Sequence, residues 1–158
     1  MLVNVNAMET SARATLRTKG EEFTSSADVT KFGTWEVQGA GTTAAGADKL
    51  AKVTDVQEGG VMTITALTLD ASQTLKLTGG DLTFAGTTNL DQGTKTFTSG
   101  TYRFADRAVL ETALGSLSAV LNNPSATLGE SFNATLRTKG RTFTSSADVA
   151  KFGTWEVQ

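Results

Sequence analysis

The chain has 158 residues, a net charge of −2, 39% hydrophobic residues, and no histidine or cysteine. The near-neutral charge gives no basic surface for nucleic acid, and the missing residue types exclude histidine catalysis, thiol chemistry, disulfides and zinc sites built from them. The apolar runs are too short to span a membrane, and the first residues lack the regions of a signal peptide.

Alternating apolar and polar residues begin near the start of the chain. Threonine is the commonest residue, and its β-branched side chain favours strands. Residues 15–19 predict a strand, Ser26–Val29 a short helical turn, and residues 34–38 a second strand. Trp35 and Val37 share one face of that strand, so we expect them in the core.

The middle of the chain predicts further short strands. Residues 39–46 read as a flexible connector, and residues 50–56 as a strand or a short helix. In residues 61–69 the apolar positions change parity near Ala66, which indicates a bulge. Four alternating segments follow, with glycine-containing turns between them: residues 74–78, 81–85, 94–98 and 101–104.

One helix is predicted over residues 107–121. Leu110, Leu114, Leu117 and Leu121 form an apolar stripe at helical spacing. Asp106 would cap this helix, and the Asn-Asn-Pro run that follows would end it.

These elements predict an all-β fold in a single domain, residues 1–158. We expect a β-sandwich or barrel-like fold with one packed α-helix at about residues 107–121. The alternative is a β-solenoid with a flanking helix, because the segments between residues 61 and 104 are closely spaced.

A duplication is the strongest signal in the sequence. Residues 14–38 and 134–158 are identical at 22 of 25 positions, an offset of 120 residues, whereas the middle, residues 39–120, occurs once. Either copy could complete a domain with this middle, and the other copy would then be free to join a neighbouring chain by strand donation or segment exchange. The simpler interpretation is a piece of a tandem array, or a duplication without a role.

The two copies also differ in charge. The first copy carries a net −1 and the second a net +2, counted over 25 residues each. Opposite signs would favour head-to-tail contact, although drift in a loop after Gly20 and Gly140 explains the difference more simply. The candidate assembly residues are the apolar and arginine positions of the two copies: Leu16, Arg17, Phe23, Phe32, Trp35, Val37, Leu136, Arg137, Phe143, Phe152, Trp155 and Val157.

Few residues of the sequence point to catalysis or to metal binding. Glu21-Glu22 lies at a predicted turn, and the scattered aspartates do not form a calcium-binding loop. The glycines form neither a phosphate-binding loop nor a dinucleotide fingerprint. We expect no catalytic residue, no metal and no cofactor.

The sequence therefore favours a non-enzymatic structural protein whose partner is itself, as a homo-oligomer or filament. We expect a self-assembling module of a bacterial tandem-repeat surface or filament protein, such as an adhesin, located extracellularly or at the cell surface. The alternative is a phage virion protein, such as a tail-tube or decoration subunit.

Overall fold

The structure is a computed structural model that describes residues 11–122, 125–140 and 142–158. Its strands are β1 (Ser11–Thr18), β2 (Phe23–Thr24), β3 (Phe32–Val37), β4 (Thr42–Ala44), β5 (Val53–Gln57), β6 (Val61–Ile64), β7 (Thr74–Phe84), β8 (Thr87–Thr88), β9 (Thr94–Phe104), β10 (Val109–Thr112), β11 (Thr127–Leu128), β12 (Ser131–Thr138) and β13 (Phe152–Val157). The helices are the α-helix α1 (Leu117–Leu121) and the 3-10 helices η1 (Ala27–Lys31), η2 (Ala47–Lys49) and η3 (Ala147–Lys151).

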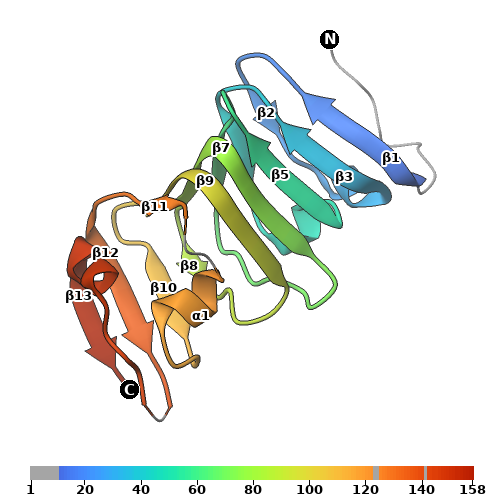
Figure 1. Cartoon of the computed structure of the whole chain (residues 1–158). Helices are drawn as coiled ribbons and strands as arrows, with labels where there is room; N and C mark the ends of the chain where they lie inside the picture. Colours follow the sequence, from blue (N-terminus) through green and yellow to red (C-terminus); the bar gives the residue numbers. More distant parts are fainter. Residues whose placement is uncertain (1–10, 123–124, 141) are drawn as a thin grey trace.

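The strands pair in parallel throughout the described residues. The chain winds once around a common axis between one strand and the strand it pairs with. Paired residues are 19 positions apart for Thr34 and Val53, and 20 for Thr74 and Thr94. We call each such turn a coil. The coils stack from β1 at one end of the molecule to β13 at the other (Figure 1).

Three ladders of strands run along this stack. The first ladder contains β1, β3, β5 and the first halves of β7 and β9. The second contains β2, β4, β6, the second halves of β7 and β9, and β11. The third contains β8, β10, β12 and β13.

A glycine corner separates the first ladder from the second. At Gly80, an added Cβ would lie 2.5 Å from the Gln57 carbonyl oxygen and 2.8 Å from that of Gly60. The backbones of successive coils therefore approach too closely at this corner for any side chain. The glycine-containing segments after residues 78 and 98 are thus bends inside β7 and β9, where the chain continues around the stack.

The core runs along the inside of the stack. Inward positions of the strands are apolar, as in β7, where Leu75, Leu77, Leu82 and Phe84 are buried. Several threonines, such as Thr54, are buried as well, and so is one charged residue, Lys95. Lys95 takes the inward position opposite Leu75 and donates a hydrogen bond from Nζ to the Leu90 carbonyl oxygen. Burial lowers the pKa of Lys95.

The expected all-β sandwich or barrel with one packed helix is wrong. The described strands make parallel-strand sheets that wrap almost completely round one core, with only short helices, so the pairing is α/β-like. The alternation of apolar residues predicts strands but does not distinguish parallel from antiparallel pairing, because a sheet of either kind can bury one face.

The helix expected over residues 107–121 is also wrong, in the preferred fold and in the alternative. Residues 109–112 form β10, which pairs with β8 on one side and β12 on the other. Helix α1 begins only at Leu117, after Ser116, whose hydroxyl accepts a hydrogen bond from the Ala119 N–H. Strand pairing on both sides overrides the helical spacing of the leucines.

Candidate functional site at the two ends of the stack

The candidate residues of the duplication lie in two groups at opposite ends of the stack. The first-copy group is carried by β1, β2 and β3, and the second-copy group by β12, β13 and the segment before η3. The first group is Leu16, Arg17, Phe23, Phe32, Trp35 and Val37, and the second is Leu136, Arg137, Phe143, Phe152, Trp155 and Val157. The structure brings together the members of each group, and it keeps the two groups apart.

The two copies have the same local structure. Leu16 pairs with Trp35 and Leu136 with Trp155, in the same parallel register. The tryptophan Nε1 donates to a threonine Oγ1 at 3.0 Å in both copies, to Thr18 in the first and Thr138 in the second. The strand pairing and the hydrogen bond of a copy are therefore properties of its own sequence.

The aromatic and ionic contacts are repeated as well. The ring centres of Phe23 and Trp35 are 5.5 Å apart, and those of Phe143 and Trp155 are 5.6 Å apart. The arginine Nε lies 2.6 Å from the Glu36 carboxylate in the first copy and 2.7 Å from the Glu156 carboxylate in the second.

Burial separates the two copies. Trp35 and Val37 have no exposed surface, whereas Trp155 is 41% exposed and Val157 is 75% exposed. The cause is the next coil: β5 pairs with β3, whereas β13 has β12 as its one strand neighbour in the described part of the chain. The core is therefore open at the C-terminal end, whereas β5 covers the corresponding residues of the first copy.

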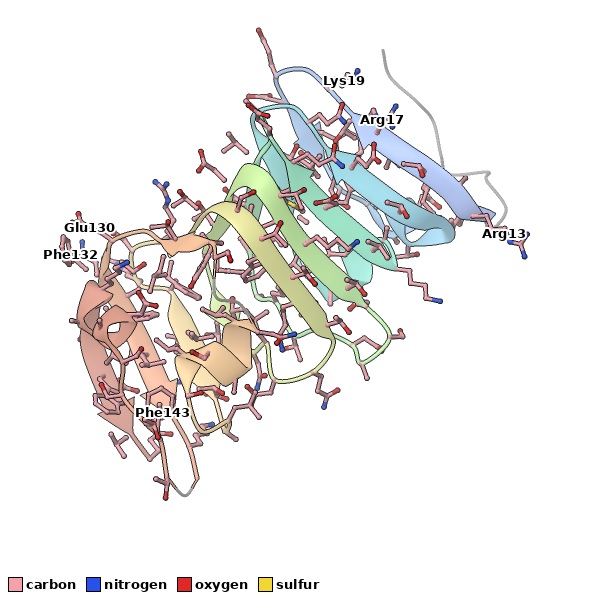
Figure 2. All side chains as sticks on the ribbon, viewed as in Figure 1. Arg13, Arg17, Lys19, Glu130, Phe132 and Phe143 are labelled. Carbon is pink, nitrogen blue, oxygen red and sulfur yellow. The ribbon has the colours of Figure 1, made fainter. Side chains whose placement is uncertain are left out.

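An apolar pocket of about 210 Å³ lies at this open end. Leu114, Phe143, Trp155 and Val157 give it an apolar lining, and Lys139 lies at its rim. Phe143 projects at the same end of the molecule in Figure 2. Apolar surface next to an unpaired strand edge is the combination that most readily accepts another protein strand.

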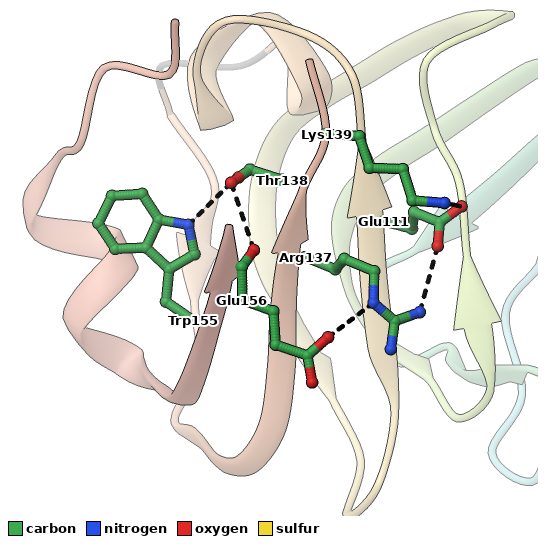
Figure 3. Close-up of polar contacts among 6 residues, drawn as sticks. All are labelled: Glu111, Arg137, Thr138, Lys139, Trp155 and Glu156. Atoms are coloured by element: carbon green, nitrogen blue, oxygen red, sulfur yellow. Dashed lines mark hydrogen bonds and ion pairs between the residues drawn. The ribbon is translucent and has the colours of Figure 1, made fainter. Parts of the chain in front are cut away.

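A row of alternating charge crosses the same end on the outer face. The Arg137 guanidinium lies between Glu111, at 3.2 Å, and Glu156, at 2.7 Å, and Lys139 Nζ lies 3.0 Å from the other Glu111 oxygen (Figure 3). The hydrogen bonds from Lys139 and Arg137 hold the pKa of Glu111 below its ordinary value, and the two glutamates raise the pKa of Arg137. A carboxylate paired with two cations is stabilised in its charged form and is poorly suited to proton transfer.

A second depression, more open, lies across neighbouring coils in the middle of the stack. It is lined by Asp48, Asp70, Ser72 and Gln73, among others. Asp70 accepts hydrogen bonds from the Ser72 N–H and hydroxyl, which lower its pKa. These bonds form a local turn. In the described residues no group of three or more acidic, histidine or cysteine side chains is placed to hold a metal ion.

Within the same described ranges, no helix has the length and hydropathy needed to cross a membrane. Comparison of the chain with protein families, with curated proteins and with solved structures finds no match.

The acidic partners of the two arginines are not among the residues predicted from sequence. Glu36 and Glu156 occupy the outward positions next to Trp35 and Trp155, so alternation places them on the outer face. The signal that identifies them as partners is the parallel register, which sets Arg17 beside Glu36 and Arg137 beside Glu156. A β-sandwich of antiparallel strands lacks this parallel register, so the expected fold did not predict these ion pairs.

Proposed function

We propose that this protein is a non-enzymatic structural module that associates with itself through the open C-terminal end of its stack. One observation carries the proposal: the residues exposed at this end are the second copy of residues that the first copy buries. Trp155 and Val157 follow the same residues as Trp35 and Val37, and they differ in that no further described strand pairs with theirs.

The physical drive for association is twofold. An unpaired parallel strand offers a row of backbone donors and acceptors to a further strand. The apolar pocket beside it adds burial, at about 25 cal/mol for each Å² of apolar surface removed from water. The strand edge and the pocket together make this end of the stack a site for contact with another protein. The duplication favours a second copy of this chain as that protein.

The setting we propose is a tandem-repeat surface or filament protein of a bacterium, outside the cell. In such an array, modules must hold neighbours in line, and an end face that repeats the interior of the stack supplies that contact. The support for this setting is the 120-residue offset between the copies.

The experiment is the solution mass of the full chain across a range of concentrations, measured by light scattering after size exclusion. We expect the mass to rise with concentration. In Val157→Asp the mass should stay that of a monomer, because association would bury a charge that the exposed monomer tolerates. A wild-type chain that remains monomeric at every concentration would overturn the proposal.

The matched control is Phe132→Asp. Phe132 is another exposed apolar residue, 61% exposed, at the start of β12. It lies outside the C-terminal pocket. This variant should therefore associate like the wild type, and thermal unfolding should show that both variants are folded.

A further inference from the structure

The two ends of the stack have complementary strand edges. The described part of the chain gives β1 one strand neighbour, β3, and β13 one neighbour, β12. We propose that β13 of one molecule pairs in parallel with β1 of a second copy of this chain, with Glu156 beside Arg17 of that copy. This inference rests on the proposed function, because it names the partner of the open end.

The register follows from the ladders within the molecule. Within each copy the parallel register sets Thr beside Thr, Leu beside Trp, and Arg beside Glu, as in Thr135–Thr154, Leu136–Trp155 and Arg137–Glu156. The same step from β13 to an incoming β1 sets Trp155 beside Leu16, Glu156 beside Arg17, and Val157 beside Thr18.

The outer charge row continues without a clash in this register. At the C-terminal end the row reads Glu111, Arg137, Glu156, with opposite charges adjacent. At the other end it begins with Arg17, which is exposed and bonded to Glu36. Joining the two rows places Glu156 between Arg137 and the incoming Arg17, so the alternation of charge is kept.

The inner rows continue as well. Leu110, Leu136 and Trp155 form one inward row, which an incoming Leu16 and Trp35 would extend. Leu16 is only partly buried in the single molecule, and Trp155 is 41% exposed. Each residue thus has apolar surface left for the other.

Other pairings between copies are less favourable. Two β1 edges placed together would gather two sets of exposed cations, Arg13 and Arg17 on β1 and Lys19 directly after it (Figure 2). Segment exchange, in which β13 replaces β3 beside β5 of another chain, must first pull Trp35 and Val37 out of the core. Addition of β1 to β13 neither brings these like charges together nor removes Trp35 and Val37 from the core.

The test is a reciprocal charge reversal in the full chain. Arg17→Glu alone and Glu156→Arg alone should each raise the concentration of half-assembly about tenfold, because an attraction in the joint becomes a repulsion. An equimolar mixture of the two variants should assemble like the wild type, because every joint in an alternating chain then pairs Glu with Arg.

The mixture separates the joint from damage within each molecule. Both variants also lose an ion pair of their own chain, Arg17–Glu36 or Arg137–Glu156, and mixing cannot restore that pair. Lys76→Glu changes the same outer row inside the stack, beside Asp55 and Thr96, and it should assemble like the wild type.

Each outcome has one meaning. Restored assembly in the mixture supports the β13–β1 joint. If the wild type assembles but mixing restores nothing, or if only Glu156→Arg weakens assembly, the joint is wrong while self-association stands. If the wild type does not assemble at all, the proposed function fails, and this inference fails with it.

Discussion

The two copies of the repeated segment differ in what covers them and hardly at all in how they fold. Both form the same parallel pair of strands, the same Trp–Thr hydrogen bond and the same Arg–Glu ion pair. Trp35 is fully buried under β5, whereas Trp155 is 41% exposed. Local sequence thus determines the shape of a coil, and its position in the stack determines how much each side chain contributes to stability.

The largest difference in stability between the two copies is expected when each tryptophan is replaced by alanine. We expect Trp35→Ala to lower the free energy of unfolding by about 3–5 kcal/mol, because it opens a cavity in the core. Trp155→Ala should cost about 1–2 kcal/mol, since much of that ring already contacts water. Chemical denaturation at a concentration where the chain is monomeric measures both, and equal losses would contradict the comparison.

The threonine partners give a smaller difference. Thr18→Val leaves the Trp35 N–H buried without an acceptor, which should cost about 1–3 kcal/mol. Thr138→Val should cost less than about 0.5 kcal/mol, because the N–H of the half-exposed Trp155 can turn to water. The same denaturation measurement applies, and the order of the two variants is the result that matters.

The turn glycines should show no difference between the copies. Gly20 has φ +113° and Gly140 has φ +95°, and neither Cβ position is crowded. Alanine at either position should therefore cost about 1 kcal/mol through backbone strain alone. A large gap between the two variants would show that position in the stack also affects the turns.

The smallest expected effect is the pH dependence of the C-terminal ion pairs. The pKa of Glu111 is lowered by Lys139 and Arg137, so its contribution to stability is full above the ordinary glutamate pKa of 4.5. That contribution is lost as the pH falls through the lowered pKa of the folded state. Thermal unfolding at pH 7 and pH 3 should show a smaller difference for Glu111→Gln than for the wild type.

Glu58→Gln, on an exposed turn, is the control for that measurement. Its pH dependence should match the wild type. If Glu111→Gln also matches the wild type, the Arg137 and Lys139 contacts do not stabilise the end of the stack.

The strands of this fold could be predicted from alternation, and the architecture could not. Residues 15–19 and 34–38 lie within or next to β1 and β3, and the parity change near Ala66 coincides with a left-handed backbone conformation at that residue, φ +50°. Strand direction depends on pairing between residues about 20 positions apart, which alternation does not encode. In the sequence alone, the glycines after Thr78 and Thr98 predict turns, because glycines that allow two coils to approach closely resemble those of a hairpin turn.

The helix over residues 107–121 failed for a related reason. The spacing of Leu110, Leu114, Leu117 and Leu121 fits a helix. Leu110 and Thr112 also alternate and are buried in β10, and Ala108, directly before this strand, is buried as well. Both periods are present in the same residues. Pairing with β8 and β12 favours the strand over the helix. The sequence alone does not show which strands lie next to this segment.

The duplication identified the segments that form the two ends of the stack. The difference in burial between these segments is visible only in the structure. All twelve candidate residues belong to one of the two ends. Three of the six in the first copy are buried, against two of the six in the second, where Trp155 and Val157 are exposed. Identical residues cannot show different exposure in a sequence. Trp155 and Val157 are exposed because β13 pairs with β12 alone among the described strands, and that is a property of the stack.

The change of ladder between the copies has a geometric consequence. The first copy lies in the ladder of β5, and the second copy lies in the ladder of β10. A molecule added at β13 through its own β1 is therefore turned about the stack axis relative to the molecule before it. An assembly grown in this way is a screw, in which any surface feature of the module winds around the fibre and faces outward in every direction.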